Sequence, residues 1–165
     1  MVWDDTVRWP KQEYGDFDEY HLREGDIVFG MDRPWVSSGT RVAYVTSDDV
    51  PSLLLQRVAR IRPHGDVFAD YLMLVFLSKQ FLAYFEPIMT GVSVPHISPE
   101  QIGAFRLFIP ECDSQHDIAT RTFAEIRLLD SLERRILDGI AKLSEYRSAL
   151  ISAAVTGKID VRGLA

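Results

Sequence analysis

The chain has 165 residues, a net charge of −6 and 47% hydrophobic residues, so it can bury one core but lacks the basic charge of a nonspecific nucleic-acid binder. It has no apolar run of 18 residues, which excludes a membrane-spanning helix, and the acidic Asp4 and Asp5 differ from the basic start of a signal peptide. The single Cys112 excludes an internal disulfide and a cysteine-based metal cluster, and we expect a cytoplasmic protein.

The first part of the chain has the pattern of short strands separated by turns. Residues 1–24 are acidic and aromatic without a clear period, and we expect loop or edge structure there. Residues 27–29 predict a short buried strand. Residues 40–46 and 53–61 are rich in Val, Leu and Ile and predict two more strands, with turn residues at 47–51 between them.

A helical pattern follows. Asp66 is a candidate cap for a core helix over residues 67–85, whose apolar residues recur at helical spacing. Residues 98–101 read Ser-Pro-Glu-Gln, which is typical of a capped helical turn. In residues 105–109 the side chains Phe105, Leu107 and Ile109 alternate with Arg106 and Phe108, a spacing that predicts a final strand. The pattern as a whole predicts an α+β fold.

The last third predicts one long helix. We expect a small domain over residues 1–110, a hinge at 111–114, a helix over 115–156 and a tail at 157–165. Ser114 with Asp117 would cap its start, and Gly157 fits the position after its end. Its apolar residues recur every three or four positions, interrupted only at Gly139: Leu129, Leu132, Ile136, Leu143, Tyr146 and Leu150. This seam predicts pairing with a second long helix; the alternative is a helix folded back on its own domain.

Two irregular segments and a nearby strand carry side chains that can bind DNA. Arg is a bidentate donor to guanine, hydroxyls bond bases or phosphates, and a Trp ring can stack. The candidates are Arg33, Trp35, Ser37, Ser38, Thr40 and Arg41 in the first segment, Arg57 and Arg60 on the strand, and Thr90, Ser93 and His96 in the second segment. The alternative is that Trp35 lies in the core and the arginines are ordinary surface charges.

Catalytic and metal sites have little support. The four histidines have no metal-ligand spacing, and no serine lies in a nucleophile elbow. We therefore expect neither an enzyme nor a metal site, and a small enzyme using Ser93 or His96 is the least favoured alternative.

Three stretches together resemble the specificity subunit of type I restriction-modification enzymes. Residues 24–29, Glu-Gly-Asp-Ile-Val-Phe, resemble the family's strand leading into a recognition loop. Residues 90–98, followed by 105–110, resemble its glycine-containing loop, short helix and Ile-Pro strand. Residues 143–160 resemble its helix end. The resemblance covers residues 24–162 and implies one target-recognition domain with its long helix. Only 110 residues precede the helix, so we expect a half-subunit or a fragment lacking the first strands.

The resemblance implies a non-catalytic protein that recognises one half of a split double-stranded DNA site. It also implies a methyltransferase subunit, which uses S-adenosylmethionine, and a restriction subunit as partners, with no cofactor bound by this chain. The long helix would form an antiparallel coiled coil with a second copy or with another specificity half. The alternative is an adaptor or decoy fragment that binds methyltransferase or specificity subunits without reading DNA.

Overall fold

The computed structural model describes residues 6–36, 39–89 and 94–159. The chain divides into two compact units, Met1–Ala119 and Thr120–Ala165. The first combines a small antiparallel sheet with short helices, and the second consists mainly of a long helix. The predicted α+β class is confirmed.

The sheet of the first unit has the order β4-β1-β5, and both pairings are antiparallel. β1 (Ile27–Gly30) is central, and its apolar side chains are buried as predicted. β4 (Val42–Tyr44) and β5 (Val58–Ile61) are shorter than the strands expected at 40–46 and 53–61. A separate hairpin joins β2 (Trp35–Val36) to β3 (Gly39–Thr40), inside the segment expected to be a loop.

The single helix predicted over residues 67–85 is wrong, because the structure has two helices there. α1 (Ala69–Leu77) and α2 (Lys79–Phe85) are separated by Ser78, whose backbone is extended, with ψ at 150°. The Ser78 hydroxyl accepts a hydrogen bond from the Phe81 N–H at 3.2 Å and so caps α2. Both helices keep the apolar pattern, which is why the break is not visible in hydrophobic spacing. The expected cap, Asp66, lies two residues before Phe68, the residue at the N-cap position.

An aromatic cluster connects the sheet to these helices. The Phe81 ring lies 5.6 Å from Phe29 of β1 and 5.1 Å from Phe76 of α1, measured between centroids. Phe85 and Phe105 lie 4.6 Å and 5.2 Å from the same ring. Phe29, Phe81 and Phe85 have no measurable exposure. Burial of large rings in edge-to-face contacts is a strong stabilising term for a unit of this size.

The remaining short elements agree only in part with expectation. Residues expected to be loop or edge structure contain a 3-10 helix, η1 (Lys11–Tyr20), with a kink at Phe17. Two more single turns are η2 (Ser47–Asp49) and η3 (Glu86–Ile88). The predicted capped turn is confirmed as α3 (Pro99–Ala104), where Ser98 and Gln101 form a capping box.

The strand predicted at 105–109 is wrong, because these residues have no regular secondary structure. The Phe105 N–H bonds back to the Ile102 carbonyl at the end of α3, and the Phe108 carbonyl accepts a hydrogen bond from the Tyr71 hydroxyl at 2.8 Å. Phe105 packs in the core, while Phe108 is 81% exposed. The alternating side chains of residues 105–109 therefore do not belong to a paired strand.

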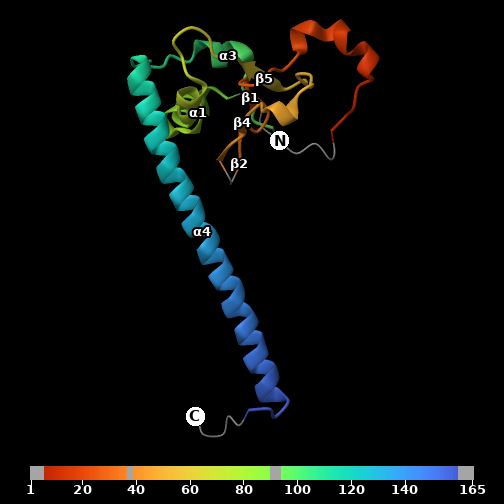
Figure 1. Cartoon of the computed structure of the whole chain (residues 1–165), viewed down its shortest axis with the longest axis vertical. Coiled ribbons are helices and arrows are strands. Elements are labelled where there is room, and N and C mark those ends of the chain that lie inside the picture. The colour runs from red at the N-terminus through yellow and green to blue at the C-terminus, as the bar shows by residue number, and fades with distance from the viewer. Residues whose placement is uncertain (1–5, 37–38, 90–93, 160–165) are drawn as a thin grey trace. The chain divides into compact units, whose positions relative to one another are not determined.

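The long helix is confirmed as α4 (Cys112–Val155), one element of 44 residues that spans about 66 Å (Figure 1). It begins at Cys112, within the residues expected to form the hinge. The capping role predicted for Ser114 is therefore wrong, because Ser114 lies inside the helix.

Gln115 fixes the first turns of α4 within the first unit. Its side chain is fully buried. The amide oxygen accepts a hydrogen bond from the Phe68 N–H at 3.0 Å, and the amide nitrogen donates to the carbonyls of Asp66 and Pro110, both at 2.8 Å. All of its bonding groups bind the backbone at the start of α1 and before α4, so this glutamine couples two segments far apart in sequence.

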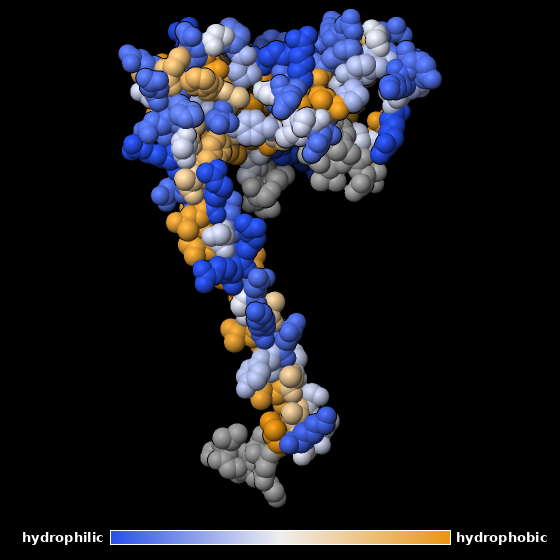
Figure 2. All heavy atoms as spheres, viewed as in Figure 1, coloured by the Kyte–Doolittle hydropathy of each residue, from blue (hydrophilic) through white to orange (hydrophobic). Residues whose placement is uncertain are grey.

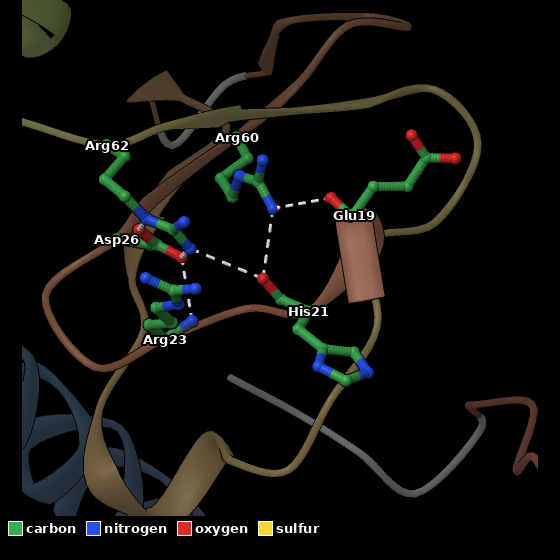
Figure 3. Close-up of polar contacts among 6 residues, drawn as sticks. All are labelled: Glu19, His21, Arg23, Asp26, Arg60 and Arg62. Atoms are coloured by element: carbon green, nitrogen blue, oxygen red, sulfur yellow. Dashed lines mark hydrogen bonds and ion pairs between the residues drawn. The ribbon is translucent and has the colours of Figure 1, made fainter. Parts of the chain in front are cut away.

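A partly buried ion pair joins the residue before β1 to the residue after β5 (Figure 3). Asp26, which is 1% exposed, accepts hydrogen bonds from Arg62 Nε at 2.6 Å and Nη2 at 2.7 Å, and from the Arg23 N–H at 2.8 Å. Burial raises the pKa of the Asp26 carboxyl, but these hydrogen bonds and the charges of Arg62 and Arg60 outweigh it and hold the pKa below its ordinary value. The folded state therefore prefers the carboxylate.

Replacing Asp26 with Asn should lower the free energy of unfolding by about 2 to 3 kcal/mol at neutral pH, because the partly exposed Arg62 then loses its charged partner and faces a buried, uncharged amide. The contribution is present above the carboxyl pKa of the unfolded chain, about 3.9, and is lost as pH falls through the lower folded pKa. Urea denaturation should thus show a difference between wild type and variant that shrinks below about pH 4. Asp16→Asn, at an exposed position, is the matched control; equal effects of the two variants would contradict the role of this pair.

Candidate nucleic-acid interface

Four chain segments meet where β1 ends. The Gly30 N–H donates to the Arg41 carbonyl at 2.8 Å, and the Met31 N–H donates to the Arg57 carbonyl at 2.9 Å. The Arg33 N–H donates to the Pro95 carbonyl at 2.7 Å, in a segment more than 60 positions away. These backbone bonds gather several residues that the sequence placed in separate segments.

The side chain of Asp32 organises the same place. The Asp32 carboxylate lies 2.8 Å from His96 Nδ1 and 3.4 Å from the Arg57 guanidinium. The backbone carbonyl of Asp32 accepts a hydrogen bond from the Arg41 guanidinium at 3.0 Å. We call Asp32, Arg33, Arg41, Arg57 and His96 the Asp32 cluster. The Arg57 guanidinium and the His96 imidazole lie at the Asp32 carboxylate, whereas the Arg41 guanidinium binds the backbone carbonyl of that residue. Arg33 follows Asp32 directly in the sequence, and all five residues are at least partly exposed.

The backbone of the Asp32 cluster is strained. Arg33 has φ of 44° and Arg57 has φ of 68°, and within the described ranges they alone among non-glycine residues have positive φ. Such conformations cost about 1 to 3 kcal/mol each and concentrate at functional sites. The positive φ of both arginines makes this place a candidate functional site.

The other predicted DNA-binding residues are distributed differently. Thr40 pairs with Trp35 across the β2-β3 hairpin, next to the cluster in sequence. Arg60 lies further along β5 and donates to the carbonyls of Glu19 at 2.9 Å and His21 at 3.0 Å, where it fixes the end of η1 (Figure 3). Its guanidinium therefore has a structural task in this unit. Ser37, Ser38, Thr90 and Ser93 lie outside the described residues.

Asp32 is the member of the cluster that sequence reasoning missed. An acid is not an expected DNA ligand, since carboxylates repel phosphates. The available signal is its position in Gly-Met-Asp-Arg-Pro, between the end of β1 and the two candidate arginines. A short acid in that place can hold neighbouring guanidinium groups by charge-assisted hydrogen bonds.

The apolar seam predicted on the long helix is solvent-exposed in α4. Figure 2 shows apolar side chains recurring along the helix among charged ones. The six predicted residues range from 40% exposed at Leu150 to 69% at Leu143. The prediction missed Ile140, which is 57% exposed and lies beside the same seam. Exposed apolar side chains in a continuous row are typical of interaction surfaces.

The described residues hold no group of three or more His, Cys, Asp or Glu side chains that could bind a metal ion. Among the helices in the described ranges, none has the length and apolarity needed to cross a membrane.

The chain is similar to specificity subunits of type I restriction enzymes. It is 36% identical over 102 residues to the EcoAI specificity subunit of Escherichia coli, covering 61% of this chain and 17% of that protein. It is 23% identical over 165 residues to the MjaVIII specificity subunit of Methanocaldococcus jannaschii, covering 99% of this chain and 38% of that protein. No protein-family model matches the chain. The predicted resemblance is confirmed, and the chain spans less than half the length of these two relatives.

The strain at Arg33 predicts an unusual order of stability among its variants. Arg33→Ala and Arg33→Gly both lose the guanidinium, but only glycine adopts φ of 44° freely. The glycine variant should be more stable than the alanine variant by about 0.5 to 1 kcal/mol in urea denaturation. At Arg106, which is not among the positive-φ residues, the same two changes should give the opposite order. An alanine variant of Arg33 as stable as the glycine variant would show that the backbone there is unstrained.

Proposed function

We propose that this chain is a DNA-recognition component of a type I restriction-modification complex. The observation that carries the proposal is the similarity of the chain to two specificity subunits, one of which aligns with nearly its whole length. The physical support is the Asp32 cluster, where the fold collects strained, exposed arginines at the end of a rigid strand.

The Asp32 cluster reads DNA through its guanidinium groups in this proposal. Arg33 and Arg41 are the donors to base edges, with guanine as the preferred partner, because the planar fork of Arg matches its two acceptors. Arg57 and His96 contact the phosphate backbone. Because the chain carries a net charge of −6, its affinity for DNA without partners is weak and sensitive to salt.

The second unit supplies the partner surface. α4 pairs with α4 of a second copy, or with another specificity half, in an antiparallel coiled coil. The start of α4 is fixed in the first unit by Gln115, so antiparallel pairing places the two recognition units at opposite ends of the helix pair. A two-fold dimer of this kind fits a palindromic, split site.

Catalysis lies with the partners in this scheme. The methyltransferase subunit binds S-adenosylmethionine and transfers the methyl group, and the restriction subunit cleaves. This chain positions both on the site and contributes no reacting group or cofactor.

A second candidate function is an adaptor or decoy that binds methyltransferase or specificity subunits without reading DNA. It is favoured by the exposed apolar row of α4, which is suited to binding another helix. DNA binding measured with and without a cognate methyltransferase separates the two functions, because an adaptor shows sequence-specific binding in neither case.

Replacing Arg33 or Arg41 with Ala should relax or weaken target discrimination by about 1 to 3 kcal/mol per lost base contact. The measurement is a methylation assay with a cognate methyltransferase on the target site and on single-base variants of it. Arg106→Ala removes the same charge from an exposed position outside the cluster and is the control. Unchanged preference in both cluster variants, with normal folding, would mean that another loop reads the DNA.

The chain should be a dimer at micromolar concentration, with twice the 18.8 kDa mass of one copy in light scattering. Leu143→Lys should shift it toward monomer, because it puts a charge in the apolar row. Ser148→Lys, on the solvated face of the same helix, should leave the mass unchanged. A strict monomer in the wild type would contradict the pairing of α4.

A further inference from the structure

Two oppositely charged residues of α4 are placed symmetrically about Ile140. Glu133 lies seven residues before it and Arg147 seven residues after it, and both are exposed. About 21 Å of helix separates them, so they cannot meet within one copy. When two copies of the helix run antiparallel about this centre, however, Glu133 of one copy lies near Arg147 of the other.

The apolar row of the second unit has a strict seven-residue repeat that defines the seam. Leu129, Ile136, Leu143 and Leu150 form one line of it. Each is followed after three residues by a member of a second line, which consists of Leu132, Gly139, Tyr146 and Ala153. Spacing of this kind is that of the two core positions of a coiled coil. Glu133 and Arg147 each come one residue after a member of the second line, so both border the same edge of the seam.

We infer that α4 binds a second copy of itself in one register, with Gly139 opposite Leu143 of the second copy and Glu133 paired with Arg147 of the second copy. The inference rests on the proposed pairing of α4 and specifies its partner and alignment. Two-fold symmetry makes the ion pair twice, once on each side of the centre.

The core layers of this register are complementary in size. The apolar layers pair Leu129 with Ala153, Leu132 with Leu150, Ile136 with Tyr146, and Gly139 with Leu143. Gly139 has open space where a Cβ would be, and the Leu143 side chain of the second copy fills it. A parallel pair would instead put Gly139 opposite Gly139 and leave a cavity, which destabilises a core.

Charge selects the register and the direction. Moving one copy by one heptad puts Glu133 opposite Ile140 or Ala154, which leaves both charges without a counterpart at the seam. A parallel pair brings Lys142 next to Arg147 of the other copy, twice, and like charges at these flanking positions oppose pairing. In the antiparallel register Lys142 of one copy approaches Lys142 of the other, but Asp138 lies four residues before it on the same helix and offsets that charge.

Charge reversal in the full chain tests this alignment. Glu133→Arg alone, or Arg147→Glu alone, turns both ion pairs of the homodimer into like-charge contacts. Each should raise the dissociation constant of the homodimer roughly tenfold at low salt, measured by analytical ultracentrifugation, and the effect should shrink at high salt. The double variant has reversed but complementary pairs and should dimerise close to the wild-type level.

Mixing the two single variants is the sharper test. The Glu133→Arg copy carries Arg at both positions and the Arg147→Glu copy carries Glu at both, so a mixture should form a heterodimer tighter than either homodimer. The control pair, Arg134→Glu and Glu145→Arg, makes the same charge changes at exposed positions away from the seam and should show neither loss nor recovery.

The outcomes separate the register from the function. A wild-type chain that is monomeric at every concentration overturns the pairing of α4 and the register with it. A wild-type dimer whose single variants lose nothing, or whose mixture recovers nothing, overturns the register alone and leaves the proposed role in DNA recognition standing.

Discussion

The exposed apolar row of α4 is the constraint on which the rest of this molecule depends. A helix of 44 residues has two residues that are buried in the folded chain, Gln115 and Ala119, and both lie in its first turns. The hydrophobic effect favours removing the remaining row from water. The backbone of the helix is satisfied internally, while its side chains leave an apolar row exposed.

Two aspartates at opposite ends of β1 hold arginine side chains in different environments. Asp26, before the strand, is buried and binds Arg62 in a bidentate pair, which ties the sheet together at one end. Asp32, after the strand, is partly exposed and holds Arg57 and His96 at the other end. A buried ion pair must be complete because desolvation penalises an unpaired charge. An exposed pair contributes little to stability because solvent screens both charges.

The sequence anticipated the features that depend on local pattern. The long helix follows from its uninterrupted periodicity, the central strand from its apolar run, and α3 from its capping box. Features set by a competing hydrogen bond escaped prediction. Ser78 ends α1 because its hydroxyl caps α2. Residues 105–109 form no strand, because Phe105 packs in the core and the Phe108 carbonyl binds the Tyr71 hydroxyl. Similar limits apply to the candidate site, where four of eleven predicted residues lie outside the described ranges and Arg60 binds carbonyls of η1.

By itself the sequence determined which residue types face which way: the apolar row of α4, the arginines of the irregular segments, and the resemblance to type I specificity subunits that the relatives confirm. Only the tertiary structure decided which of these groups meet. Asp32 joins Arg57 and His96, and Gln115 joins the start of α4 to α1, because backbone hydrogen bonds bring segments tens of residues apart into contact. A repeating apolar pattern depends on residues that are close along the chain, so the sequence reveals it. A site depends on residues that are close in space, and the pairing of strands brings those residues together.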